Sequence, residues 1–206
     1  MRAAAVCLLH APCRVPGCSN ASHVPAWGLQ RGAPRRWHFT SPHPGQRPGT
    51  RHPVKITGWD DAKATIRGAL QQHGPVFGLM GFSQGATAAA MYASCCAADA
   101  ALPAPRCVLC VAGFMPRDDE CAAWLRRDGV AMPALHVVGE ADEIISRERS
   151  EELAKVCAAG RTHVHAGGHL VPSCTGEVKQ CLTQFFDGVP AEGGGVGRAS
   201  QAVSAL

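Results

Sequence analysis

The sequence predicts an α/β fold, in which a mostly parallel sheet carries helices on both of its faces. From about residue 60 onward, short apolar runs of strand length alternate with longer helix-forming runs. The strand candidates are nearly continuous apolar segments, as burial on both faces of a sheet requires. Because strands that alternate with helices are joined by right-handed crossovers, neighbouring strands are expected to run parallel.

The individual elements follow one another in a regular order between residues 60 and 188. The first helix candidate opens with an Asp suited to capping and places Ile66 and Leu70 four residues apart on one face. A later helix candidate carries acidic residues early, basic residues late and Gly129 at its end. The expected helices span 60–74, 84–100, 118–129, 146–160 and 176–188, and the expected strands span 76–82, 106–114, 134–142 and 161–168.

Charge divides the chain into a basic first segment and a mildly acidic remainder. Residues 1–59 contain eight Lys and Arg and no acidic residue, so the net charge of +4 for the whole chain leaves −4 for the rest. A nucleic-acid-binding domain is expected to be basic where it is folded, and this pattern argues against a nucleic-acid partner. We predict three regions, which are an irregular, Pro- and Arg-rich segment at 1–54, the α/β core at 55–187 and a disordered tail at 188–206.

The composition also bears on location and on metal chemistry. No apolar run approaches the length needed to cross a bilayer, so we expect a cytoplasmic protein without a membrane span. The segment 1–54 has the composition of an organellar transit peptide, or it is a degenerate start of the domain. Of the eleven cysteines, Cys107 and Cys110 form a C-x-x-C within a strand candidate, where alternation points them to opposite faces. We therefore expect reduced, buried thiols, with no metal site and no cofactor.

The first chemical motif is the pentapeptide Gly-x-Ser-x-Gly at 81–85, between an apolar run and an alanine-rich run. On a sharp turn from strand to helix, Ser83 would be exposed as a nucleophile, and small neighbours such as Gly81 would be required. The N–H of Gln84 would then lie at a helix N-terminus, where it could stabilise an oxyanion. The alternative is a glycine-rich helix entry in which the serine only caps the helix.

Two further candidates follow the ends of later strands. Asp142 comes after the third strand of the core and His169 lies in a Gly-Gly loop after the fourth. Each has an ordinary alternative, a turn-forming Asp and a surface His. Ligands of open α/β sheets bind beyond the carboxyl ends of the strands, and Ser, Asp, His is the chain order of the α/β-hydrolase triad. Competing residues are Glu140 and Glu143 near the acid, and His163 and His165 on the strand before the base.

Four blocks of the sequence, at 74–90, 107–117, 135–145 and 165–172, are similar to those of a known family. They resemble the small eukaryotic serine hydrolases of the α/β-hydrolase superfamily known from yeast and from an ovarian-cancer-associated human member. The similarity covers roughly residues 55–187, and 35–39 resembles a block further upstream. It implies that Ser83 is the nucleophile, Asp142 the orienting acid and His169 the base, acting on carboxylic esters or thioesters. The acyl-protein thioesterases, which share the G-F-S-Q-G block, are the nearest rival family.

The resemblance also bears on the substrate pocket and the oxyanion hole. Phe82, Phe114 and Met115 are candidate pocket residues, although Phe114 and Met115 suit simple core packing equally well. Family members begin with a strand that runs into Leu-His-Gly-Phe, whose loop supplies a second oxyanion donor. Here the corresponding segment places Ala11 at the Gly position and Pro12, which has no N–H, at the donor position. This departure implies an incomplete oxyanion hole and a weakened activity.

The sequence therefore predicts a serine hydrolase that cleaves a small acyl ester or thioester through Ser83, His169 and Asp142, without a cofactor. Two alternatives remain open, a catalytically impaired hydrolase fold that serves as a binding module and an acyl-protein-thioesterase-like enzyme.

Overall fold

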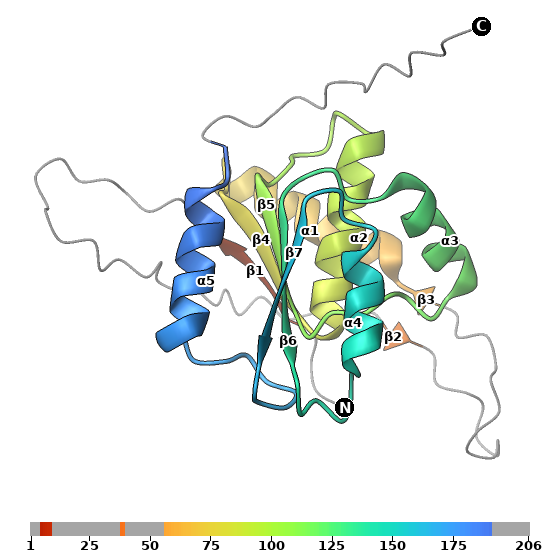
Figure 1. The fold of residues 1–206 in the computed structure, drawn as a ribbon. Helices are drawn as coiled ribbons and strands as arrows, with labels where there is room; N and C mark the ends of the chain where they lie inside the picture. Colours follow the sequence, from red (N-terminus) through yellow and green to blue (C-terminus); the bar gives the residue numbers. More distant parts are fainter. Residues whose placement is uncertain (1–4, 10–37, 40–55, 191–206) are drawn as a thin grey trace, which may run out of the picture.

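Five strands form one sheet in the order β1-β4-β5-β6-β7, in a computed structural model that describes residues 5–9, 38–39 and 56–190 (Figure 1). The four strands from β4 to β7 are parallel to one another, and β1 is antiparallel to β4. The predicted α/β sheet with parallel central strands is confirmed. The strands are β1 (Ala5–Leu9), β4 (Gly78–Phe82), β5 (Cys107–Val111), β6 (Ala134–Gly139) and β7 (Gly160–His165).

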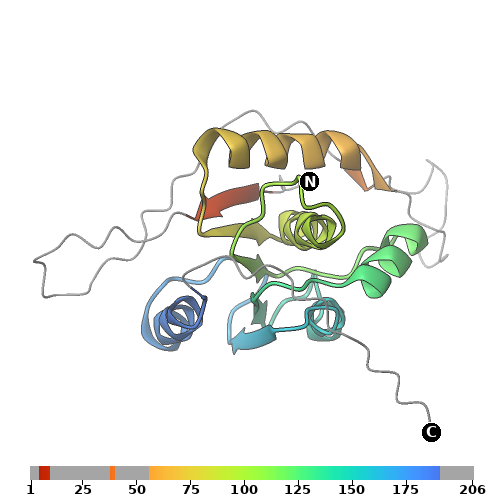
Figure 2. The ribbon, with the colours of Figure 1, turned by 90° about the horizontal axis from the view of Figure 1, so that it is seen from above.

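Helices cover both faces of this sheet. Among the described residues, α5 contributes to the core on one face, and α1 to α4 contribute to the core on the other. Figure 1 shows α5 to the left of the sheet and α2, α3 and α4 to its right, and Figure 2 shows the same layers from above. The helices are α1 (Trp59–His73), α2 (Gln84–Ala98), α3 (Asp119–Asp128), α4 (Arg147–Ala154) and α5 (Gly176–Asp187).

The helix ends follow from local chemistry. In α1 the predicted face is correct, because Ile66 and Leu70 are both buried. The Asp118 carboxylate caps α3 by accepting hydrogen bonds from the backbone N–H groups of the first turn, at 3.0 and 3.2 Å. Gly129 ends the same helix with a φ of 64°, a backbone conformation that a residue with a side chain adopts only under strain. The expected end of α3 at Gly129 is confirmed, whereas the Asp expected to cap α1 does not do so, because Gly58 holds the N-cap position and Asp60 lies in the first turn.

The two cores meet across β5, where alternation sends successive side chains to opposite faces. Cys107 belongs to the cluster beneath α5, and Cys110 belongs to the cluster beneath α1 to α4. The C-x-x-C pair therefore cannot chelate one ion or form a disulfide across the sheet, as the period of a strand predicts. The eight cysteines between residues 56 and 190 are all free thiols.

The first segment departs from the expectation of an irregular region at 1–54. Within it, Ala5–Leu9 forms the edge strand β1, and β2 (His38–Phe39) pairs with β3 (Ile56–Thr57) in a separate two-stranded sheet. In the antiparallel register, Ala5 lies opposite Phe82 and Leu9 lies opposite Gly78. The chain therefore leaves β1 at the amino end of β4, away from Ser83.

The far end of the chain also differs from the expectation. The tail was predicted to begin at 188, but Val189 is buried in the core beneath α5 and the Arg106 side chain donates a hydrogen bond to the carbonyl of Pro190. Burial of an apolar side chain keeps this stretch against the sheet. Residues 191–206, which hold the rest of the expected tail, lie outside the described residues. Within the part described, no helix is long and apolar enough to span a membrane.

Candidate functional site

Ser83 stands alone between the end of β4 at Phe82 and the start of α2 at Gln84. Its backbone has a φ of 54° and a ψ of −122°, a combination that is strained for any residue with a side chain. The turn also requires glycine at position 81, because a Cβ there would lie 2.2 Å from the carbonyl oxygen of Gly85. The strained turn predicted from the pentapeptide is therefore present.

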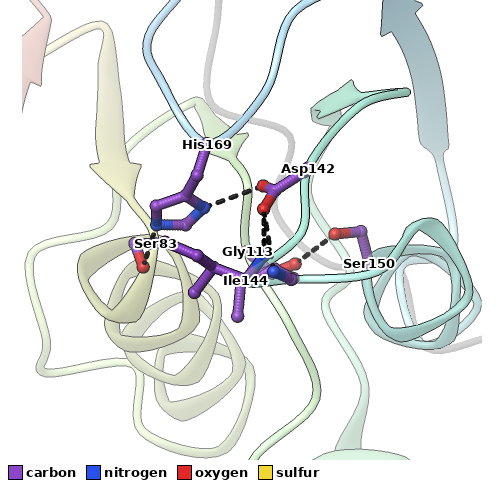
Figure 3. A network of polar contacts seen from close by, with 7 residues as sticks. Ser83, Gly113, Asp142, Ile144, Ser150 and His169 are labelled. Atoms are coloured by element: carbon purple, nitrogen blue, oxygen red, sulfur yellow. Dashed lines mark hydrogen bonds and ion pairs between the residues drawn. The ribbon is translucent and has the colours of Figure 1, made fainter.

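The Ser83 hydroxyl faces a histidine and does not cap α2. Ser83 occupies the N-cap position but makes no side-chain hydrogen bond to the helix. Its Oγ lies 3.0 Å from Nε2 of His169 (Figure 3). This geometry is that of a hydroxyl next to a base that can take its proton, and it rules out the alternative in which the serine only caps the helix.

Asp142 holds the other nitrogen of the same ring. Its Oδ2 lies 2.8 Å from Nδ1 of His169, and its Oδ1 accepts hydrogen bonds from the N–H groups of Ile144 and Ile145 at 2.9 and 2.8 Å (Figure 3). Burial opposes ionisation of the carboxyl, but the hydrogen bonds from Ile145, His169 and Ile144 outweigh it and lower its pKa. Asp142 is therefore an anion held in place by hydrogen bonds, and it orients the imidazole of His169.

Glycines allow the loops that carry Asp142 and His169 to lie against each other. A Cβ at Gly139 would lie 2.5 Å from the carbonyl oxygens of both Gly167 and Gly168. The N–H of Ala141 donates to the carbonyl of Gly167 at 3.2 Å, which joins the two loops directly. This close backbone approach brings together two side chains that are 27 residues apart in the sequence.

The competing acids and histidines lie elsewhere. Glu140 and Glu143 are exposed, whereas Asp142 is 8% exposed. Nδ1 of His165 accepts a hydrogen bond from the N–H of Gly167 at 3.1 Å, so this residue supports the His169 loop. His163 has a buried Nε2 without a hydrogen-bond partner in the described structure, and neither histidine contacts Ser83 in any hydrogen bond found there.

The three candidate pocket residues occupy different surroundings. The Phe82 ring packs against the ring of His169 at a centroid distance of 4.9 Å and so lies at the site. Met115 belongs to the core cluster beneath α1 to α4 and faces a hollow of about 480 Å³ between α3 and α4. Phe114 is 6% exposed and lies beneath the guanidinium of Arg149. The structure thus brings Phe82 to the histidine, and core packing accounts for Met115.

Two buried hydroxyls that the sequence analysis did not single out hold the loop after β5. The Thr87 hydroxyl, one turn into α2, donates to the carbonyl of Phe114 at 2.7 Å and accepts from its N–H at 3.3 Å. The Ser150 hydroxyl on α4 donates to the carbonyl of Gly113 at 2.7 Å (Figure 3). The sequence offered little indication of this role, because each hydroxyl belongs to a single small polar residue within a helix candidate.

Of the two residues expected to form the oxyanion hole, Gln84 lies within the described residues and Ala11 does not. The N–H of Gln84 belongs to the first residue of α2, directly after Ser83, where helix N–H groups point out of the helix. Ala11 lies outside the described residues. The strand that precedes it ends opposite Gly78, at the edge of the sheet remote from Ser83.

Exposed apolar side chains flank the site. Among the described residues, the exposed large hydrophobic side chains are Ile144, Leu170 and Val171. They lie within two positions of Asp142 or His169 in the sequence, so this apolar surface is concentrated on the two loops of the site. Among the described residues, no group of three or more His, Cys, Asp or Glu side chains is arranged to hold a metal ion.

A Ser-His-Asp chain at the carboxyl edge of a parallel sheet, with the serine on a strained turn from strand to helix, defines the class of α/β-hydrolases. The sequence profile of the family described as Serine hydrolase (FSH1) matches residues 2–181, and this chain belongs to that family. The resemblance noted in the four sequence blocks is thereby confirmed.

Curated relatives agree with this membership. Esterase OVCA2 of Homo sapiens is 32% identical over 155 residues, which cover 75% of this chain and 68% of the human protein. Esterase OVCA2 of Bos taurus is 32% identical over 158 residues with the same two coverages. The chain is also similar to the solved structure of acyl-protein thioesterase 2 from Zea mays, with 21% identity, a TM-score of 0.47, and coverage of 63% of this chain and 65% of that one.

Proposed function

We propose that this chain hydrolyses carboxylic esters or thioesters by nucleophilic catalysis at Ser83. The observation that carries the proposal is the continuous hydrogen-bonded chain in which His169 lies 3.0 Å from the Ser83 hydroxyl and 2.8 Å from the Asp142 carboxylate. The family membership supports a hydrolase, and relatives named esterases support the ester bond.

In the proposed reaction, His169 removes the proton of the Ser83 hydroxyl as the oxygen attacks the acyl carbonyl. The N–H of Gln84, at the N-terminus of α2, donates to the oxyanion that forms. His169 then gives the proton to the departing alcohol or thiol, which leaves an acyl group on Ser83. Water attacks this acyl-enzyme with His169 as the base and releases the acid, while Asp142 stabilises the imidazolium in both steps.

Labelling with a fluorophosphonate tests this proposal, because the reagent reacts with activated serines. We expect labelling of the wild-type chain and none of Ser83→Ala, with Ser173→Ala as the control at an exposed serine of the same chain. Hydrolysis of acyl esters and of the matching acyl thioesters then distinguishes the two substrate classes. Equal labelling of wild type and Ser83→Ala would contradict the proposal.

One observation favours a second candidate function, a hydrolase fold that binds its ligand with little turnover. Because β1 runs antiparallel to β4, its end lies away from Ser83, and the one oxyanion donor that we propose among the described residues is the N–H of Gln84. Loss of one such donor lowers kcat by about 10²- to 10³-fold. Background rates across the whole substrate series, together with saturable binding of the same esters, would favour this candidate.

The subcellular location of the protein is a separate proposal. We propose the cytoplasm, with an organelle as the alternative on account of the basic composition of residues 1–54. Imaging of fluorescent fusions with and without residues 1–36 distinguishes them, since removal of a transit peptide would abolish organellar signal.

A further inference from the structure

Arg149 carries a charge that is partly buried next to the site and belongs to no ion pair there. The residue lies in the first turn of α4, and its guanidinium stacks on the ring of Phe114, with the guanidinium carbon 4.6 Å from the ring centroid. Its side chain is only partly exposed. No ion pair of the described residues involves Arg149 or its neighbour in space, Arg117.

The acids around Arg149 are committed to other partners. Glu152 pairs with Arg126 at 2.5 Å, and Glu151 pairs with Arg147 at 2.6 Å. Asp142 accepts from His169 and from two backbone N–H groups. Burial and the nearby charge of Arg117 lower the pKa of Arg149, and Asp142 and Glu152 raise it. The two guanidiniums therefore repel each other, and a bound anion would relieve that repulsion.

The guanidinium of Arg149 is connected to the nucleophile through one ring contact and two hydrogen bonds. The Phe114 ring beneath it belongs to a loop whose carbonyl is held by the Thr87 hydroxyl at 2.7 Å. The N–H of Thr87 in turn donates to the carbonyl of Ser83 at 3.3 Å, within the first turn of α2. Arg149 is thus linked to Ser83 through the loop after β5, and it lies near enough to Asp142 for the charge of that carboxylate to raise its pKa.

We propose that Arg149, with Arg117, binds a carboxylate at the far end of the substrate's acyl group, so that half-esters or half-thioesters of dicarboxylic acids are the favoured substrates. The guanidinium fork of arginine matches a carboxylate with two parallel hydrogen bonds. The contact is noncovalent and the hydrolysis is unchanged. The bond from the acyl carbon to the leaving oxygen or sulfur breaks, water supplies the hydroxyl, and the dicarboxylic acid and the alcohol or thiol are released. This inference rests on the proposed hydrolysis at Ser83.

Matched substrates test the inference kinetically. Monoethyl succinate, glutarate and adipate are compared with ethyl butyrate, valerate and hexanoate, with acid release followed by titration at constant pH. We expect the wild-type chain to prefer the anionic member of at least one pair, and Arg149→Gln to reduce that preference about tenfold, mainly through KM. Arg149→Lys should restore part of it. Arg147→Gln, on the same helix but exposed and paired with Glu151, is the control that should leave the preference unchanged.

Direct binding separates this inference from the proposed function. Glutarate is titrated into Ser83→Ala in a calorimeter, and the measurement is repeated in Ser83→Ala combined with Arg149→Gln. We expect saturable binding in the first protein and its loss in the second. If neutral esters are hydrolysed and Ser83 is labelled, but no anionic preference and no glutarate binding occur, the inference is wrong and the proposed function stands. Binding of inorganic phosphate without binding of glutarate would overturn the carboxylate assignment.

Discussion

Gly139 and Gly168 approach each other so closely that a Cβ on Gly139 would lie 2.5 Å from the carbonyl oxygen of Gly168. Gly139 lies at the start of the loop that carries Asp142, and Gly168 lies in the loop that carries His169, so their contact holds the two loops together. The separation of the acid and the base is thus fixed by the backbone, and their side chains need only adopt ordinary positions. Substitutions at these glycines are expected to lower catalysis by increasing the distance between the Asp142 carboxylate and the His169 ring.

Gly139→Ala is expected to lower both activity and stability, because the new methyl group must push the two loops apart. We expect kcat to fall by at least about tenfold, and the free energy of unfolding by about 1–3 kcal/mol. Urea denaturation and ester hydrolysis measure the two effects. Gly68→Ala on α1, where a Cβ meets nothing within 4 Å, is the control and should be neutral or slightly stabilising. A fully active Gly139→Ala would contradict this account of the loops.

Asp142→Asn is expected to reduce kcat by about 10⁴-fold with little change in KM. An amide retains the size of the carboxylate but cannot hold the protonated imidazole, and it favours the wrong tautomer. The exposed neighbour Glu143, changed to Gln, should leave kcat within experimental error. Equal effects of the two substitutions would show that Asp142 acts only through the net charge of its loop.

Ser150→Ala is expected to destabilise the protein by about 1–3 kcal/mol, because it leaves the carbonyl of Gly113 buried without its donor. The loop after β5 would then lose one of the two side-chain hydroxyls that hold its carbonyls, the other being Thr87, and both activity and fluorophosphonate labelling should decline. Thermal unfolding measures the first effect. Ser173→Ala, at an exposed serine, should change neither quantity, and an equal loss in both variants would contradict the role assigned to Ser150.

Stability is expected to decline below about pH 6.5 because of His136. Burial lowers the pKa of this residue on β6 from 6.5 to about 4, while Nε2 lies 3.4 Å from the sulfur of Cys157. Between these values the unfolded chain binds a proton that the folded chain does not, so stability present above pH 6.5 is lost as the pH falls towards 4. The full shift corresponds to a loss on the order of 3 kcal/mol.

Urea denaturation at pH 7 and at pH 5 measures this dependence. His136→Leu removes the titrating group, and its unfolding free energy should change less between the two pH values than that of the wild type. The comparison uses the slope with pH, so a general loss of stability in the variant does not affect it. Parallel slopes in the two proteins would contradict the assignment of acid sensitivity to His136.

Local sequence patterns were sufficient to predict most helices and strands of the core. The helix over 60–74 was readable because Ile66 and Leu70 share one face, and the structure buries both. The turn at Ser83 was readable because only small residues fit around it, as the clash at Gly81 shows. The roles of Thr87 and Ser150 could not be predicted from the sequence, because a single hydroxyl in a helix does not indicate which distant carbonyl it will donate to.

By itself, the sequence determined the alternation of strands and helices and the chain order of Ser83, Asp142 and His169, because these depend on periodicity and on the chemistry of single residues. Only the tertiary structure decided that β1 runs antiparallel to β4 and that Arg149 stacks on Phe114. The sequence of a short apolar strand does not indicate whether it runs parallel or antiparallel to its neighbour. The sequence around a charged residue on a helix does not indicate which side chain it will contact. Both are settled by long-range packing, in which the burial of many side chains outweighs any local preference.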